Sequence, residues 1–205
     1  MSKFWNERYD TDKYVYGVEP NHFFKESILH LPAGNILLPA EGEGRNAVFA
    51  AQNGWTVEAF DQSEIAQKKA FDLAKKSGVR INYRIDRFET IDYPVEQFDV
   101  IALIYAHLPS PEKTIYFRKL LPLLKKGGYI LFEGFSKDHR IFQEQNKSAG
   151  GPKEIDMLYS KGELSEIFQG TKIILLEQCL ISLDEGVGHN GSASVIRMIA
   201  QNTSF

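Results

Sequence analysis

The chain has 205 residues and a formal net charge of −3; 43% of its residues are hydrophobic and 25% are charged. These values are ordinary for one soluble globular domain, and the charge disfavours nucleic acid as a partner, because phosphate binding needs clustered lysine and arginine. The single cysteine, Cys179, excludes an intramolecular disulfide and a metal cage of cysteines. No apolar run approaches the roughly 20 residues of a membrane span, and the first ten residues do not resemble a signal peptide. We therefore expect a cytoplasmic protein without membrane contacts.

From residue 36 onward, short apolar stretches alternate with stretches of helical periodicity. The pattern predicts strands at 36–39, 56–60, 81–85, 98–105 and 129–135, and helices at 45–53, 63–77 and 112–124. Successive strands joined by helices pair in parallel, so the series indicates a parallel sheet with helices on both faces.

The carboxy-terminal part of the pattern departs from this alternation. A helix is expected at 160–168, after a long loop from 136, and strands are expected at 172–183 and 192–201. The polar, glycine-rich gap at 184–191 allows no helix, so these two strands should form an antiparallel hairpin. The predicted fold is an α/β three-layer sandwich with a seven-stranded, mostly parallel sheet whose last strand is antiparallel.

We expect one domain over 1–205 with four functional parts. They are a helical, aromatic cover at 1–30, a cofactor-binding core at 34–135, a loop or lid at 136–159, and a carboxy-terminal helix and hairpin at 160–205.

The candidate chemistry centres on the stretch PAEGEGRNA at 39–47, which follows the first strand and opens the first helix. Gly42 and Gly44 have no Cβ, so a ligand can approach their backbone closely, and the helix start offers unpaired N–H groups. Asp61 ends the next strand, where its carboxylate can accept hydrogen bonds from both ribose hydroxyls of an adenosine ligand. The alternative is a tight turn with Asp61 capping a helix.

These residues carry a family resemblance. AEGEGRNA at 40–47 and GWTVEAFDQS at 54–63 resemble motif I and its sequel in class I methyltransferases, and most closely the tellurite-resistance and thiopurine methyltransferase-like group. Matching segments also occur at 5–9, 14–21, 98–101, 124–130 and 151–159. The resemblance implies a Rossmann-like methyltransferase fold with S-adenosylmethionine as cofactor. The resemblance indicates no particular substrate, but the short chain and its aromatic amino-terminal segment lead us to expect a small-molecule acceptor, and the loop after the fourth strand lacks the motifs of other mechanisms, so we expect direct in-line displacement.

Two positions depart from the family motif. Leu38 stands where the family has an acid, and Ala40 replaces the first glycine. The family's acid orders the loop and helps to place the methionine end of the cofactor. Glu41 and Glu43 are the candidates to replace it.

The resemblance, together with the strand ends, gives a set of expected site residues. Those expected to bind the cofactor are Ala40, Glu41, Gly42, Gly44, Asn46, Asp61, Gln62, Asp86, Arg87, Phe88 and Ile104. Within this set, residues 86–88 are expected at the adenine, although Asp86 can also be a solvated turn acid. No metal site and no covalent intermediate are expected.

The expected catalytic candidates are His107, Arg8 and Tyr16. His107 follows the fourth strand, where it would position the acceptor or take its proton, or else cap the next helix or face solvent. Arg8 and Tyr16 belong to an aromatic segment that would close over the acceptor, whereas Phe23 and Phe24 are expected to pack in the core. His189 is expected in a surface turn, with a place in the pocket, reached from the edge of the sheet, as the alternative.

Two other functions fit part of the pattern. Gly42 and Gly44, with Asp61, also match a dinucleotide fingerprint, which would indicate an NAD(P)-dependent oxidoreductase. The only Tyr-x-x-x-Lys pair, Tyr9 and Lys13, precedes the glycine loop, where such enzymes do not place it. A non-catalytic S-adenosylmethionine-binding protein is the second alternative. The sequence leaves the acceptor and the oligomeric state open.

Overall fold

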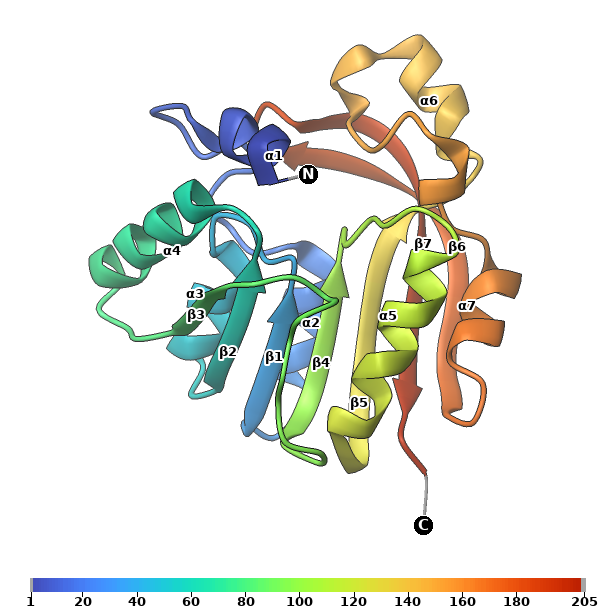
Figure 1. Cartoon of the computed structure of the whole chain (residues 1–205). Coiled ribbons are helices and arrows are strands. Elements are labelled where there is room, and N and C mark those ends of the chain that lie inside the picture. The colour runs from blue at the N-terminus through green and yellow to red at the C-terminus, as the bar shows by residue number, and fades with distance from the viewer. Residues whose placement is uncertain (1, 204–205) are drawn as a thin grey trace.

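A computed structural model describes residues 2–203 as one twisted sheet with helices on both faces (Figure 1). The strands are β1 (Asn35–Pro39), β2 (Thr56–Asp61), β3 (Asn82–Ile85), β4 (Phe98–Ile104), β5 (Leu124–Phe135), β6 (Lys172–Glu185) and β7 (His189–Gln201). The α-helices are α1 (Ser2–Tyr9), α2 (His22–Leu29), α3 (Arg45–Gln52), α4 (Glu64–Lys76), α5 (Glu112–Leu120), α6 (His139–Gln145) and α7 (Lys161–Ile167). Short 3-10 turns are η1 (Leu121–Leu123), η2 (Lys147–Ala149) and η3 (Ile155–Met157).

The strand order is β3-β2-β1-β4-β5-β7-β6. Strands β1 to β5 pair in parallel, and β7 runs antiparallel to both β5 and β6. This arrangement confirms the predicted α/β fold with its antiparallel last strand. The order of the strands reverses between β1 and β4, and ligands of open α/β sheets bind beside such a reversal, at the carboxyl ends of the strands.

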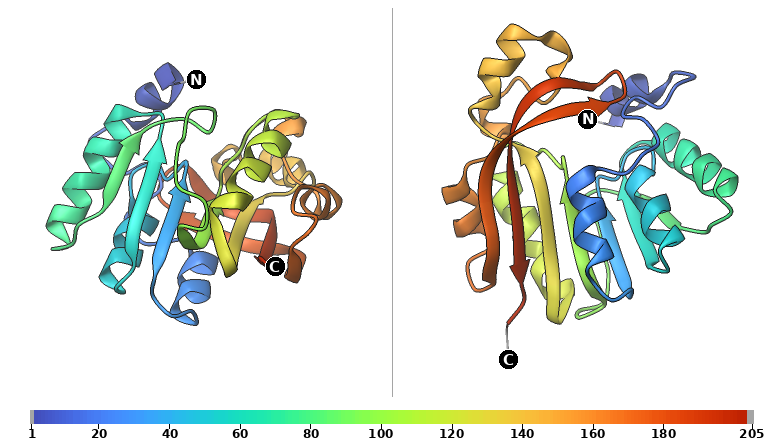
Figure 2. Two further views of the ribbon diagram at one scale, coloured as in Figure 1. Left: turned by 60° about the horizontal axis from the view of Figure 1, so that its bottom comes forward. Right: turned by 180° about the vertical axis from the view of Figure 1, so that it is seen from behind.

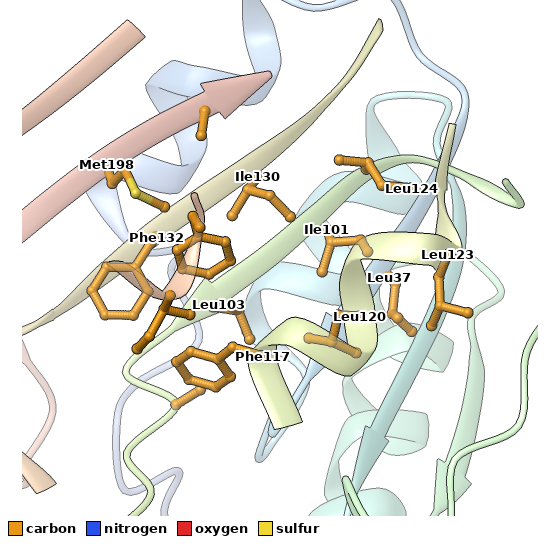
Figure 3. Packing of buried hydrophobic residues seen from close by; sticks show 14 of the residues in the cluster. Leu37, Ile101, Leu103, Phe117, Leu120, Leu123, Leu124, Ile130, Phe132 and Met198 are labelled. Carbon is orange, nitrogen blue, oxygen red and sulfur yellow. The ribbon is translucent and has the colours of Figure 1, made fainter. Parts of the chain in front are cut away.

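Alternate residues of each strand pack on opposite faces of the sheet. Leu37 belongs to the cluster covered by α5 and α7, whereas its neighbours Ile36 and Leu38 belong to the cluster covered by α2, α3 and α4. Figure 3 shows Phe117 and Leu120 of α5 against strand residues of the first cluster. Phe23 and Phe24 of α2 are buried in the second cluster, as expected. Each such side chain stabilises the fold by about 1.5–3 kcal/mol.

Three expected boundaries differ from the structure, and one of them is the start of β5, which lies at Leu124 rather than at residue 129. Helix α5 ends at Leu120 rather than near residue 124, and Pro122, which has no N–H to donate, lies in η1. The segment 136–159, expected to be a loop, contains α6, η2 and η3.

The β6–β7 hairpin is longer than expected. Asp184 pairs with Asn190 and Glu185 with His189, so most of the polar gap at 184–191 is strand and only 186–188 turns. The pairing satisfies the backbone N–H and C=O groups of these polar residues, and pairing between strands does not require apolar side chains.

Three segments stand over the carboxyl ends of the parallel strands (Figures 1 and 2). They are the amino-terminal segment 2–18, the hairpin tip 183–191, and the α6 segment 136–159; we call them together the roof. The hairpin tip lies between the other two: Gly188 donates its N–H to the Val15 carbonyl at 3.2 Å, and Asn146 donates to the Asn190 carbonyl at 2.9 Å. Among the helices of residues 2–203, none has the length and hydropathy of a membrane-spanning segment.

Candidate active site

A cavity of about 1190 Å³ lies between the roof and the carboxyl ends of β1, β2 and β4. Of the site residues expected from the sequence, all except Gly44 line it. They are Arg8, Tyr16, Ala40, Glu41, Gly42, Asn46, Asp61, Gln62, Asp86, Arg87, Phe88, Ile104 and His107. A second cavity of about 620 Å³ lies near the amino-terminal ends of β4, β5 and β6, and none of the expected site residues lines it.

Asp61 occupies the floor of the large cavity at the end of β2. One carboxylate oxygen accepts the Gly42 N–H at 3.2 Å, and the other accepts the Ser63 N–H at 3.0 Å. The side chain is buried, and burial raises its pKa to about 6. A carboxylate has about four acceptor directions, so Asp61 can accept further hydrogen bonds from the hydroxyl groups of a ligand.

The two glycines of the loop after β1 contact different parts of the molecule. Gly42 lines the cavity with a φ of +65°, and a Cβ there would lie 2.8 Å from the Tyr9 hydroxyl. Gly44 caps α3 with a φ of +90°, and its Cβ would lie 2.5 Å from the Cβ of Ala70 in α4. The expectation that Gly44 leaves room for a ligand is therefore wrong: its missing side chain lets α3 and α4 pack closely.

The glutamates of the same loop hold it in place. Glu41 accepts the Ala47 N–H at the start of α3 at 2.7 Å, and burial raises its pKa to about 7. Glu43 accepts the Val15 N–H at 2.7 Å and pairs with Lys69 of α4 at 2.6 Å. Ala40 keeps a positive φ of 53° at the position of the family's first glycine. Both glutamates thus order the loop in which the family's acid is missing.

Residues 86–88 form a turn at the edge of the cavity. The Asp86 carboxylate accepts the Arg87 N–H at 2.8 Å and also bonds the Thr90 hydroxyl. Phe88 is buried, with its ring 5.3 Å from that of Phe60. Asp86 therefore stabilises the turn in addition to lining the cavity.

His107 has partners on both ring nitrogens. Its Nδ1 lies 2.8 Å from the Met157 carbonyl, and its Nε2 accepts the Phe135 N–H at 3.4 Å. Burial lowers its pKa to about 3. The neutral ring thus joins the loop after β4 to η3 and β5, so it does not cap the next helix but lies half-buried in the cavity wall.

A buried polar network behind the cavity was missed by the sequence reasoning. Glu133, wholly buried in β5, accepts from Asn21 at 2.6 Å and from Arg197 of β7 at 2.6 Å. Glu185 pairs with Arg45 at 2.9 Å. An acid inside the apolar stretch 129–135 was the one available signal for Glu133, because a buried charge needs a partner.

His189 is buried and lines the cavity, so the expectation of a surface turn is wrong. Its ring centroid lies 4.5 Å from those of Tyr16 and Tyr105. The cause is the length of the hairpin, which carries the tip beyond the sheet edge and over the strand ends. Within residues 2–203, no group of three His, Cys, Asp or Glu side chains is arranged to hold a metal ion.

Comparison with known proteins agrees with this geometry. Residues 36–128 match the family model of a methyltransferase domain, which spans β1 to the start of β5 and none of the roof. Over 142 residues the chain is 25% identical to a ubiquinone biosynthesis O-methyltransferase of Pseudomonas fluorescens. That match covers 67% of this chain and 60% of the length of the relative.

Solved structures share the fold over nearly the full length of the described residues. One is the structure reported for the conversion of a disulfide bond into a thioacetal group during echinomycin biosynthesis, with a TM-score of 0.79 and 16% identity over 98% of this chain and 92% of that one. Another is TehB from Haemophilus influenzae, with a TM-score of 0.68 and 15% identity over 98% of this chain and 66% of that one.

Further structures with this fold are S-adenosylmethionine-dependent methyltransferases. The fold is therefore the Rossmann-like fold of class I methyltransferases. The domain match and the relative support S-adenosylmethionine-dependent methyl transfer, with S-adenosylmethionine as the cofactor.

Proposed function

We propose that this protein transfers the methyl group of S-adenosylmethionine to a small molecule enclosed beneath the roof. The observation that carries the proposal is the buried Asp61 carboxylate, which lies with the glycine loop on the floor of a roofed cavity. Pockets for single ligands of drug size measure roughly 300–1,000 Å³, so a cavity of about 1190 Å³ has room for a cofactor and an acceptor.

The cavity wall fits the parts of the cofactor. Asp61 would accept hydrogen bonds from the ribose hydroxyls, with Gln62 beside it, and the turn 86–88 and Ile104 would border the adenine. The methionine end would lie along Ala40, Glu41 and Asn46. When bound, the sulfonium supplies an electrophilic methyl group, so the protein needs only to align the acceptor and exclude water.

The roof supplies the acceptor side of the proposed site. Arg8 and Tyr16 reach the cavity from the amino-terminal segment, with the Arg8 guanidinium 5.9 Å from the Tyr16 ring centroid. His107 would position the acceptor as a neutral group. Segments that close the cavity from above favour a small acceptor over a nucleic acid strand or a protein surface.

The finer assignments are part of the same proposal. Membership of the tellurite-resistance-like group is supported by the motifs at 5–9 and 14–21 and by the similarity to TehB. A cytoplasmic location is supported by the lone cysteine, which suits a reducing compartment.

The test is calorimetric binding of S-adenosylhomocysteine to the wild type, Asp61→Asn and Asp72→Asn. Asp61→Asn keeps the size of the side chain and one acceptor oxygen but loses the charge, so affinity should fall by about 1–3 kcal/mol. Asp72→Asn makes the same change at an exposed position of α4 that lies outside the cavity, so this variant should bind S-adenosylhomocysteine like the wild type. Equal affinity of all three folded proteins would refute the ribose assignment, and tight binding without turnover of any small acceptor would indicate a non-catalytic binding protein.

A further inference from the structure

We infer that His189 accepts the proton of the methyl acceptor and that Glu185 orients its imidazole for this task. The inference rests on the proposed function and concerns how that site activates its acceptor. It comes from a comparison of His189 with His107. Both rings pack against Phe135 in the cavity wall, with centroids 5.2 and 5.5 Å away, but their nitrogens have different partners.

The hydrogen bond of His189 determines which nitrogen is free. Its Nδ1 lies 3.0 Å from the Glu185 carboxylate. Because an ionised carboxylate only accepts, Nδ1 carries the proton of the neutral ring and Nε2 keeps its lone pair. Within residues 2–203, no hydrogen bond is made to Nε2, and this nitrogen is accessible to solvent. Because the ring lines the cavity, Nε2 opens onto the cavity.

Glu185 is held so that it can orient the ring. Arg45 donates to the same carboxylate oxygen as His189, at 2.9 Å, and Asn21 donates to the other oxygen at 3.2 Å. Burial opposes ionisation of Glu185, but the hydrogen bonds and charges of His189 and Arg45 outweigh it and lower its pKa to about 2. A base that is oriented by a fixed third group is the arrangement of nucleophile-activating sites.

The surroundings keep His189 neutral before the reaction. Burial lowers its pKa, while the hydrogen bond and charge of Glu185 raise it. The titratable and charged groups that face the ring are Glu185 on β6, Arg45 on α3, Arg8 on α1, His107 after β4, His139 on α6, and the tyrosines Tyr16 and Tyr105. The two arginines oppose a charge on the ring and Glu185 favours it, so a proton gained in the reaction has an adjacent anion.

His107 cannot take this part without losing a contact. Its Nε2 already accepts the Phe135 N–H, and its Nδ1 contacts the Met157 carbonyl. Protonation at Nε2 would break the first bond and leave a buried N–H of β5 without a partner, which disfavours the protonated ring.

The acceptor heteroatom forms a bond to the methyl carbon and gives its proton to Nε2 of His189, while the electron pair of the broken sulfur–methyl bond stays on sulfur. The resulting imidazolium pairs with Glu185 until it releases the proton to water. A hydroxyl acceptor with a pKa of about 10 needs this help, whereas a thiol with a pKa of about 8.5 or lower is already partly ionised near pH 8.

The experiment makes one substitution at both histidines. Asparagine keeps a donor near the position of Nδ1 but has no equivalent of Nε2. With catechol as the hydroxyl probe, His189→Asn should lower kcat/KM by about 10²–10⁴-fold, the usual contribution of a general base. With thiophenol as the thiol probe, the loss should be less than about tenfold. His107→Asn should lower kcat/KM for catechol and for thiophenol by similar factors and leave the pH dependence of kcat/KM unchanged. Equal losses for both probes in His189→Asn would overturn the inference.

A second measurement needs no turnover and tests the inference even if neither probe is methylated or His189→Asn does not fold. Nitrogen-15 NMR of the wild type with S-adenosylhomocysteine should show His189 at pH 7.5 protonated at Nδ1 and bare at Nε2. Glu185→Gln should lower the pKa of His189. A ring protonated at Nε2, or a pKa unchanged by Glu185→Gln, would overturn the inference. S-adenosylhomocysteine affinity, measured on the same samples, separates this failure from failure of the proposed function.

Discussion

At the scale of single residues, Gly44 and Gly78 share a left-handed backbone but differ in their surroundings. A Cβ on Gly44, at φ +90°, would meet Ala70, whereas a Cβ on Gly78, at φ +70°, would have no atom within 4 Å. Gly78→Ala should therefore lower the free energy of unfolding by only about 1 kcal/mol, because of backbone strain. Gly44→Ala should lower it by about 1–3 kcal/mol more, because the added methyl group overpacks the contact with Ala70. Urea denaturation of both variants measures the difference, and equal losses would show that the α3–α4 contact relaxes freely.

Glu41 gives a prediction of pH dependence. Burial raises its pKa from 4.5 to about 7, so the folded state binds more protons than the unfolded state between these values. Its contribution to stability is therefore lost as the pH rises through this window, by at most about 1.4 kcal/mol per pH unit. Glu41→Gln lacks this loss, so its free energy of unfolding relative to the wild type should rise from pH 5 to pH 7.5. Urea titrations across the range test this; a constant difference would contradict the prediction.

The positions of residues that depend on the succession of neighbouring strands and helices were predictable from the sequence. The positions that depend on contacts between residues far apart in the chain were not. Asp61 was placed correctly at the floor of the cavity because an apolar strand ends there and the next helix begins. His189 was misplaced because its burial depends on how far the hairpin extends, which the register of β6 against β7 decides. Glu133 was overlooked because its partners Asn21 and Arg197 lie 112 and 64 residues away.

At the scale of elements, the strands were predicted more accurately than the roof. The seven strands follow from clear apolar stretches, and the alternation of strands with helices predicted that most of them pair in parallel, but the order of the strands in the sheet was not predicted. The α6 segment has little apolar periodicity, and most of α6 is exposed or half-buried, so no buried stripe marks its helix in the sequence.

The contact between the hairpin tip and the amino-terminal segment can be tested at Gly186. A Cβ there would lie 2.5 Å from the Val15 carbonyl and 2.7 Å from the Gly17 nitrogen, which are backbone atoms that a side-chain rotation cannot move. Gly186→Ala should therefore separate the two segments and increase amide hydrogen exchange at 14–18 and 185–189, but not in β1, β4 or β5. Gly170→Ala, at φ +92° with open space around it, is the control. Unchanged exchange at both segments would show that this part of the roof is not held by the contact.

At the scale of the whole molecule, the change in Tm on adding a ligand shows which cofactor the folded chain binds. A ligand that binds only the folded state adds RT ln(1 + [L]/Kd), about 2.7 kcal/mol at a concentration 100 times Kd. S-adenosylhomocysteine should therefore raise the Tm of the intact chain, and NAD⁺ should not. The reverse result would support the oxidoreductase that the glycine pattern alone also allows.

The position of β7 has a consequence for biosynthesis. This strand comes last among the seven but lies inside the sheet, between β5 and β6. A nascent chain that has reached residue 185 therefore presents β5 with an open edge, and Glu133 without the guanidinium of Arg197. Residues 15–17 also lack their contacts with the hairpin tip until the tip has formed. An open edge and an unpaired buried acid favour wrong association, so translation through residue 201 is the interval in which a chaperone would protect this chain most.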